Sequence, residues 1–208
     1  MPMVLRAAAN FAYFGAFFLF PLLMERGYGY SIPRVGAIAI ARPAVFALSS
    51  PIAGYVAMRI GERVSAIAGA AFLTASLVLF ASLHPSSGAW VVVGALALSG
   101  LGMGVAMPSS SSVMANEVKV SEFGVMSAAQ MLAVQVGEVA GIEVLETVQQ
   151  ALVHRRHLGR AHAGPDLLAT FHVPFEIGAG VAALGLLSAV FIRDVPRRSP
   201  REGSWVSR

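Results

Sequence analysis

Residues 64–83 read VSAIAGAAFLTASLVLFASL, and this stretch decides the fold class of the chain. It contains no Asp, Glu, Lys or Arg, and neither does the stretch AWVVVGALALSGLGMGVAMPSSSSVMAN at residues 89–116. A helix of about 20 mainly apolar residues is long enough to cross the hydrocarbon core of a bilayer. Both stretches are therefore predicted to be transmembrane helices.

The composition of the whole chain supports this prediction. Hydrophobic residues make up 56% and charged residues 12% of the 208 residues, and the mean hydropathy is +0.70. Soluble domains are roughly 45–50% apolar and about 25% charged. The net charge of +4 would suggest a nucleic-acid partner for a soluble protein. Here the arginines lie mostly between or after apolar stretches, so membrane topology explains them and no nucleic-acid partner is expected.

The chain contains no cysteine. Disulfides, thiolate nucleophiles and cysteine-ligated metals are therefore excluded as sources of stability or chemistry. No other catalytic motif is apparent: the sequence shows no Ser-His-Asp order, no metal-ligand spacing and no phosphate-binding Gly-Lys-Ser/Thr loop. We expect no enzymatic activity.

The apolar pattern predicts an all-α membrane protein of six transmembrane helices. These helices form one domain over residues 1–195, and a basic tail without fixed structure is expected over 196–208. No small-residue cleavage site follows the first helix, so we expect it to be retained. Four of the five connections are short, so neighbouring helices should pack antiparallel. The predicted spans are residues 5–24, 34–56, 64–83, 89–115, 124–149 and 171–192.

Lysines and arginines are unequally divided between the two sides of the membrane. Six crossings put both termini on one side, which holds nine of these residues, while the opposite side holds five. The positive-inside rule then predicts cytoplasmic termini for a multi-pass protein of the cell membrane. The nine are Arg6, Arg59, Arg63, Lys119, Arg193, Arg197, Arg198, Arg201 and Arg208; the five are Arg26, Arg34, Arg155, Arg156 and Arg160.

The long connection at residues 151–170 contains three histidines among its arginines, His154, His157 and His162. Closely spaced histidines are candidate metal ligands. These lie on no predicted rigid element, so a solvated loop is the preferred interpretation. We expect neither a metal ion nor another cofactor.

Three stretches follow one another in an order typical of one transporter family. The first contains Phe20-Pro21, Gly27-Tyr28-Gly29-Tyr30-Ser31, Gly36, Pro43 and Ser50-Pro51-Ile52-Ala53-Gly54. The second is Gly54-Tyr55-Val56-Ala57-Met58-Arg59-Ile60-Gly61-Glu62-Arg63, and the third contains Gly100-Leu101-Gly102-Met103-Gly104, Pro108, Gly124, Ser127, Gln135, Gly137 and Gly141. Over nearly the whole chain they resemble the C-terminal six-helix half of major facilitator superfamily transporters, most closely the fourteen-helix drug:proton antiporter branch.

This resemblance implies a half-transporter built from two inverted three-helix repeats, which would rock against a second half about a site near the bilayer midplane. It also implies a gating role for the loop between spans two and three. Met58 replaces the family's Asp there and Glu62 stands where a basic residue is usual. The charge-relay role of the loop is therefore in doubt, although its turn can survive. The motif residues that remain are Gly54, Ala57, Arg59, Gly61 and Arg63.

The glycines of the apolar spans have a physical interpretation that is independent of the resemblance. Small residues spaced by four, such as Gly137 and Gly141, let helices approach closely in lipid. We therefore interpret them as packing or hinge positions rather than ligand contacts, and expect the prolines within the spans to kink their helices. The packing candidates are Gly54, Gly100, Gly102, Gly104, Gly137 and Gly141, and the prolines are Pro43, Pro51 and Pro108.

Polar side chains form a stripe about 140° wide on the fifth span. Its members are Gln135, Glu138, Glu143, Glu146 and Gln149. At 1.5 Å per residue, Glu138 lies about 21 Å into the membrane, and Arg42 of the second span lies at a matching depth of about 12 Å from the other side. Protonation neutralises a carboxylate, so a mobile Glu138–Arg42 contact would couple proton binding to conformation.

A static ion pair, or a glutamate side chain that extends to the surface, is the alternative for Glu138 and the preferred interpretation for Glu143 and Glu146. Asn10 and Tyr13 of the first span, with Ser109 to Ser112 after Pro108, are further candidates for lining a path.

The function that follows from the resemblance is proton-coupled secondary export of small or drug-like compounds, by a half-length or truncated transporter. Its partners would be the lipid bilayer, protons, a small-molecule substrate, and a second six-helix half or a second copy of the chain. The alternatives are a membrane interaction or assembly subunit that does not transport, and an inactive gene fragment.

Overall fold

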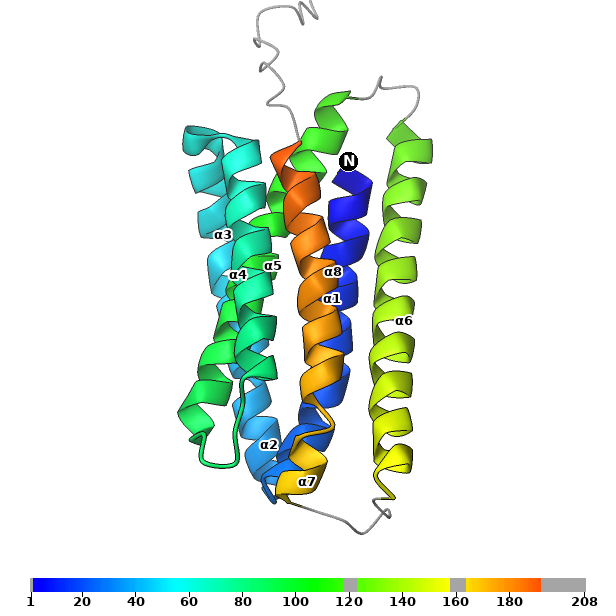
Figure 1. Ribbon diagram of the computed structural model, residues 1–208. Helices are drawn as coiled ribbons and strands as arrows, with labels where there is room; N and C mark the ends of the chain where they lie inside the picture. Colours follow the sequence, from blue (N-terminus) through cyan, green and yellow to red (C-terminus); the bar gives the residue numbers. More distant parts are fainter. Residues whose placement is uncertain (1, 118–122, 158–163, 192–208) are drawn as a thin grey trace, which may run out of the picture.

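The computed structural model describes residues 2–117, 123–157 and 164–191, and all of its regular elements there are helical (Figure 1). Six helices or helix pairs are long and apolar enough to cross a membrane, which confirms the predicted class. The elements are α1 (Pro2–Leu22), the π-helix η1 (Leu23–Gly27), α2 (Ile32–Ala39), α3 (Ala41–Ile60), α4 (Glu62–Ala81), α5 (Ala89–Glu117), α6 (Phe123–Arg155), α7 (Pro165–Leu168) and α8 (His172–Val190).

The helix contacts follow a twofold pattern. The largest interfaces are α1 with α6, α4 with α5, α3 with α5, α4 with α8 and α1 with α8. Exchanging α1 with α5, α3 with α6, and α4 with α8 turns this set of interfaces into itself. The first three spans and the last three therefore pack alike, as the predicted inverted repeats require.

The Gly-x-Gly-x-Gly sequence at residues 100–104 of α5 contacts α3 on one side of the helix and α4 on the other. A Cβ added at Gly100 or Gly104 would collide with Arg42 or Ser49 of α3, whereas one at Gly102 would lie 2.7 Å from the Leu73 nitrogen of α4. Residues two apart differ by about 200° around a helix, so alternate glycines point to opposite sides. The run therefore lets α3 and α4 both approach α5 closely.

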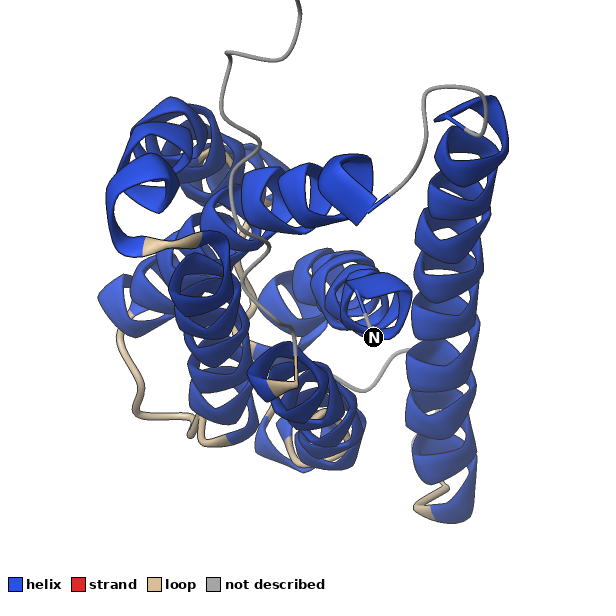
Figure 2. Cartoon of the chain, turned by 90° about the horizontal axis from the view of Figure 1, so that it is seen from above, coloured by secondary structure: helices blue, strands red, loops and turns tan. Residues whose placement is uncertain are grey.

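Glycines also set the contact between α1 and α6. Gly137 lies against the backbone of Ala7, Gly141 lies against Phe11, and a Cβ at Gly15 would be 2.7 Å from the Gly141 carbonyl oxygen. In the view from above, α6 stands at one edge of the bundle beside α1 (Figure 2). Gly54, by contrast, has nothing within 4 Å of an added Cβ.

The second span differs from the prediction of one continuous helix, because it is broken at Ile40 between α2 and α3. Pro43 lacks the N–H that would bond to the carbonyl of Ala39, four residues earlier, so the helix cannot run through this point undisturbed. Pro51 and Pro108 lie inside α3 and α5, which continue through them.

A single residue, Gly61, separates α3 from α4. It has φ 98° and ψ 149°, a conformation that side chains with a Cβ rarely adopt. Its N–H donates to the Ala57 carbonyl over 3.0 Å, and Glu62 follows in the first turn of α4. An acidic residue is favourable at a helix N-terminus.

The end of the bundle away from the termini is joined by polar contacts over an aromatic cluster. The Tyr28 hydroxyl donates to the His84 carbonyl over 2.8 Å, and His172 Nε2 lies 2.9 Å from the Leu83 carbonyl. Burial raises the pKa of the Tyr28 phenol, so its proton stays available for this bond. Beneath them the ring of Phe80 stacks on that of Phe175, with centroids 5.0 Å apart.

The predicted loop at 151–170 is shorter than expected, because α6 continues to Arg155 and α7 covers Pro165–Leu168. His154 therefore lies in the last turn of a helix rather than in a solvated loop. His162 and the predicted tail at 196–208 lie outside the described residues.

Candidate functional site

The second and fifth spans are the least covered by the rest of the protein. In their apolar windows only 17% and 11% of the residues are buried, against 44–56% in the other four spans. These two spans lie on either side of α1 and α5, and α4 and α8 pack behind (Figures 1 and 2). The face made by α1, α3, α5 and α6 is called the open face below.

Most of the polar stripe of α6 lies beside its contact with α1. Gly137, Gly141, Leu145 and Gln149 are the buried residues of α6. Gln149 donates to the Thr170 hydroxyl over 3.4 Å, and the half-buried Glu146 accepts a hydrogen bond from Gln150 over 2.8 Å.

The remaining members of the stripe differ in their surroundings. Glu138 is half-buried next to Gly137 and makes no hydrogen bond or ion pair with any described residue, and Gln135 is exposed. Glu143 is exposed because it is two residues from both Gly141 and Leu145, which puts it on the opposite side of the helix from α1.

Arg42 crosses from α3 to α1 and is only 2% exposed. Its Nη2 donates to the Tyr13 carbonyl, and its guanidinium carbon lies 3.3 Å from the centroid of the Tyr13 ring and 4.4 Å from that of Phe17. Aromatic faces attract cations, so the two rings partly replace the water that the guanidinium loses. Arg42 makes no ion pair with any described residue, and its Nε has no hydrogen-bond partner.

The structure does not bring Arg42 and Glu138 together. Glu138 follows Gly137, which contacts Ala7, whereas Arg42 contacts Tyr13 and Phe17. At 1.5 Å per residue these levels differ by roughly 8–14 Å along α1. The sequence-based depths agreed because the second and fifth spans were each assumed to begin at the membrane surface, near Arg34 and Gly124. The contacts of α3 and α6 with α1 place the two residues at different levels instead.

A cleft of about 1260 Å³ opens between α1 and α6, toward the end of the bundle that carries η1 and α7. Its inner part is aromatic, with Phe17 and Phe18, and Glu146 and Gln150 lie along its α6 wall. Glu25, Arg26 and His154 line it nearer the loops. A cleft of this size can accommodate a drug-sized molecule.

Asn10 lies deeper, between α1 and α5, and is fully buried. Its Nδ2 donates to the Arg6 carbonyl over 2.8 Å, while its Oδ1 has no hydrogen-bond partner. The hollow beside it, lined also by Leu5 and Met103, is only about 10 Å³, the size of one water molecule. Asn10 therefore does not line the large cleft, whereas the Tyr13 ring lies at the open face against Arg42.

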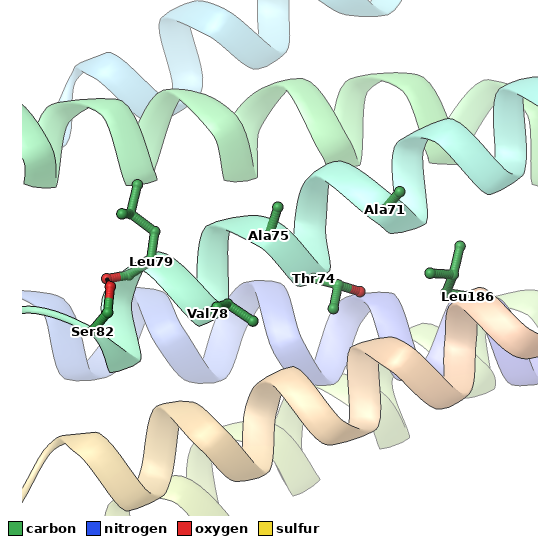
Figure 3. A pocket seen from close by; sticks show the side chains of 7 residues that line it. All are labelled: Ala71, Thr74, Ala75, Val78, Leu79, Ser82 and Leu186. Atoms are coloured by element: carbon green, nitrogen blue, oxygen red, sulfur yellow. Dashed lines mark hydrogen bonds between the residues drawn. The ribbon is translucent and has the colours of Figure 1, made fainter.

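A second hollow of about 480 Å³ lies between α4 and α8, on the side away from the open face (Figure 3). The hydroxyls of Thr74 and Ser82 bond to carbonyls of their own helix over 2.8 and 2.9 Å. The rest of the lining is apolar: Ala71, Ala75, Val78, Leu79 and Leu186. This groove suits a lipid chain rather than a polar ligand.

The remaining predicted site residues lie apart from the cleft. Arg59 donates to the Tyr55 hydroxyl one helical turn away, and Arg63 lies in the first turn of α4. The side chains of Ser109 to Ser112 are outside the described part of the structure. Among the described residues, no three His, Asp or Glu side chains are close enough to hold a metal ion.

The sequence does not single out Phe17, which is one of several phenylalanines along the first span. Phe17 contacts Arg42 and also lines the cleft. The available signal was its spacing of four from Tyr13, which puts both rings on one side of the helix. Glu25, which also lines the cleft, was not among the predicted site residues.

Comparisons with known proteins agree with this architecture. A family model described as Major Facilitator Superfamily matches residues 3–207. The multidrug transporter protein MdtP of Bacillus subtilis is 24% identical over 191 residues, which cover 90% of this chain and 35% of that protein. The multidrug resistance protein Stp of Mycobacterium tuberculosis is 28% identical over 158 residues, covering 74% of this chain and 29% of that protein.

The riboflavin transporter RibZ of Clostridioides difficile is 29% identical over 114 residues, covering 54% of this chain and 25% of that protein. The chain thus spans about a third or less of the length of these curated relatives.

Proposed function

This chain belongs to the major facilitator superfamily, and from that premise we propose that it forms one six-helix unit of a secondary transporter that exports small molecules across the plasma membrane. The curated relatives named multidrug or riboflavin transporters support a small-molecule substrate. Both termini face the cytoplasm in this proposal, as the distribution of arginines predicts.

The observation that carries the proposal is the gathering of polar and aromatic side chains on the open face. Arg42, Tyr13 and Phe17 meet there, and the cleft with Glu146 opens beside them. Ionisable groups inside a membrane generally face a water-filled cavity or a partner. On the opposite side, where α4 and α8 pack, the hollow found among the described residues has a mainly apolar lining. A substrate path along the open face fits this asymmetry.

A second six-helix unit facing this side completes the proposed transporter. The second and fifth spans, which form the two edges of the open face, are the least covered of the six, with only 17% and 11% of their apolar windows buried. In transporters built of two such bundles, the substrate site lies between the bundles near the midplane. The second unit is another part of a longer protein, a separate chain or a second copy.

Glu138 is the proposed proton-binding carboxylate. It is half-buried beside the contact of α6 with α1 and has no partner among the described residues. Ionisable side chains inside membrane spans commonly belong to proton relays or substrate paths. Because Arg42 is held at another level, the coupling is proposed to run through Glu138 alone rather than through a Glu138–Arg42 pair.

The test is proton-driven flux in everted membrane vesicles that contain the chain. Ethidium serves as a drug-like probe and riboflavin as the probe suggested by one relative's name. We expect an imposed proton gradient to drive uptake of at least one probe, and Glu138→Gln to reduce this uptake at least tenfold. The matched control is Glu143→Gln on the same helix, which should keep most of the flux.

Equal flux in the Glu138→Gln and wild-type vesicles would reject the role of Glu138. Absence of flux for both probes, together with stable co-purification of another six-helix chain, would instead favour an assembly subunit that does not transport.

A further inference from the structure

Arg42 is a buried cation whose hydrogen-bonding capacity is mostly unused. A guanidinium has five N–H donors, and Arg42 makes one hydrogen bond, from Nη2 to the Tyr13 carbonyl. Its Nε is buried without a partner, and no described carboxylate pairs with it. Burying a charge without a counter-charge is costly. Among the described residues, the site therefore lacks a negatively charged hydrogen-bond acceptor for Arg42.

Phe17 connects this cation to the cleft between α1 and α6. Its ring lies 4.4 Å from the guanidinium of Arg42, and the same residue lines the cleft between α1 and α6. Phe17 is also 38% exposed, so its ring is not locked in a packed core. A rotation of this side chain would open the guanidinium to the cleft.

The backbone of Arg42 stays in place during such a change. Its carbonyl rests on Gly100 of α5, where an added Cβ would collide with it. Once the Phe17 ring has rotated, only the long Arg42 side chain needs to move, and α3 remains on α5. This arrangement would let the Arg42 guanidinium exchange its hydrogen bond to the Tyr13 carbonyl for one to a stronger acceptor.

We propose that Arg42 binds the carboxylate of an aromatic compound that occupies the cleft between α1 and α6, with the Phe17 ring as the movable wall between them. The proposal rests on the transport function proposed above and assigns a substrate class to it. A carboxylate accepts two parallel N–H bonds from a guanidinium, and this charge-assisted pair is roughly twice as strong as a neutral one. The rings of Phe17 and Phe18 would contact the aromatic body.

The other charges of the cleft restrict the ligand to one carboxylate. Glu25 and Glu146 line it as well as Arg26 and His154. The two carboxylates outnumber the one guanidinium of the lining, so a second anionic group on the ligand is disfavoured, whereas a neutral or cationic group can lie near Glu25 or Glu146. Monocarboxylates and zwitterions therefore fit, and dianions do not.

The test is equilibrium binding to the full chain in phosphatidylcholine nanodiscs, with empty nanodiscs as the blank. Three probes share one ring system: 2-naphthoate is an anion, 2-naphthamide is neutral and 2-naphthyltrimethylammonium is a cation. We expect the anion to bind at least tenfold more tightly than the amide. Arg42→Gln should abolish that preference, and Arg42→Lys should retain part of it because it keeps the charge but loses the fork.

Arg34→Gln is the matched control. Arg34 is exposed in α2 and lies 4.0 Å from the Tyr30 ring, so it also lies over an aromatic face but outside the cleft. It should leave all three affinities unchanged. Binding is measured without a gradient or flux, so a chain that does not transport still gives a result here.

Phe17→Ala keeps the test decisive if Arg42→Gln fails to fold. Removing the ring should tighten binding of 2-naphthoate relative to 2-naphthamide, because the guanidinium then opens directly to the cleft. A relative affinity that stays the same or falls would overturn the proposal. So would tightest binding of the cation, or self-association that depends on Arg42 while naphthoate binding does not, since the carboxylate partner would then come from another protein unit.

Discussion

At the scale of single residues, the contact between α4 and α5 leaves no room for an added methyl group at its glycines. Gly69 and Gly102 face each other so closely that a Cβ on either would lie 2.8 Å from the carbonyl oxygen of the other. In lipid, apolar side chains gain little by leaving their surroundings, so close backbone contact of this kind drives helix association. The stability of this interface should therefore respond sharply to side-chain size.

Gly102→Ala is expected to destabilise the protein by roughly 1–3 kcal/mol, the usual cost of forcing extra volume into a packed interior. The matched control is Gly94→Ala on the same helix, where nothing lies within 4 Å of the added Cβ. There alanine should be neutral or stabilising by up to about 1 kcal/mol, because it is the better helix former. Thermal unfolding of both variants in the same detergent measures the difference, and equal midpoints would contradict the prediction.

Gly61→Ala tests a backbone conformation rather than packing. The residue has φ 98°, and a side chain forced into such a region costs about 1–3 kcal/mol. We therefore expect a lower unfolding temperature, with cleavage between α3 and α4 by an added protease increasing as the turn loosens. Gly36→Ala, at an exposed glycine with open space around it, should change neither measurement.

At the scale of elements, the break between α2 and α3 has a simple covalent cause in Pro43. Pro43→Ala supplies an N–H for the Ala39 carbonyl, so residues 32–60 should approach one continuous helix. One added backbone hydrogen bond is worth about 1 kcal/mol, which corresponds to roughly fivefold slower amide exchange across residues 38–46. Hydrogen–deuterium exchange with mass spectrometry reads this directly.

Pro33→Ala is the control for this experiment, since Pro33 lies at the start of α2, where no intrahelical N–H bond is needed. Unchanged exchange in Pro43→Ala would show that packing against α1 and α5, rather than the proline, breaks the helix.

The helices also show how much of the fold can be predicted from the sequence alone. Six spans, their order and the alternating small residues of α5 follow from local composition and spacing, so they were predictable. A kink at Pro43 was expected, but not that the helix would end at Ala39 and begin again at Ala41, and the helical extension of α6 to Arg155 was missed. A proline shows that a helix is disturbed but not how far, and a polar helix end gives no apolar signal.

The candidate site was predictable in its residue types but not in its pairing. Arg42 and Glu138 were singled out because ionisable groups in a span require an explanation. Their levels depend on how α1 crosses α6 at Gly137 and Gly141, a relation between distant segments that counting along each span separately cannot supply.

At the scale of the whole molecule, the two sides of the bundle should differ in their contact with water. The chain has no cysteine, so single cysteines can be introduced without background. Gln135 is an exposed residue of α6, one of the helices of the open face, and Leu187 of α8, on the other side of the bundle, is 57% exposed. Gly137 contacts Ala7 and Gly185 contacts Ala8, so the two positions lie at similar depth.

Gln135→Cys is expected to react with a water-soluble maleimide at least tenfold faster than Leu187→Cys in native membranes. The physical reason is that the thiolate is the reactive form and lipid suppresses it. Equal labelling rates would show that the open face is covered by lipid rather than by water or a hydrated partner surface.

The order of the helix contacts also has a consequence for synthesis. The chief partner of α1 is α6, and Gly15 meets Gly141 there. At about 5–20 residues per second, the ribosome needs roughly 6–25 s to make the intervening segment. During that time the glycine-lined side of α1 waits in the translocon or the bilayer without its partner. A membrane insertase that shields this side until α6 arrives would raise the yield of correctly assembled protein.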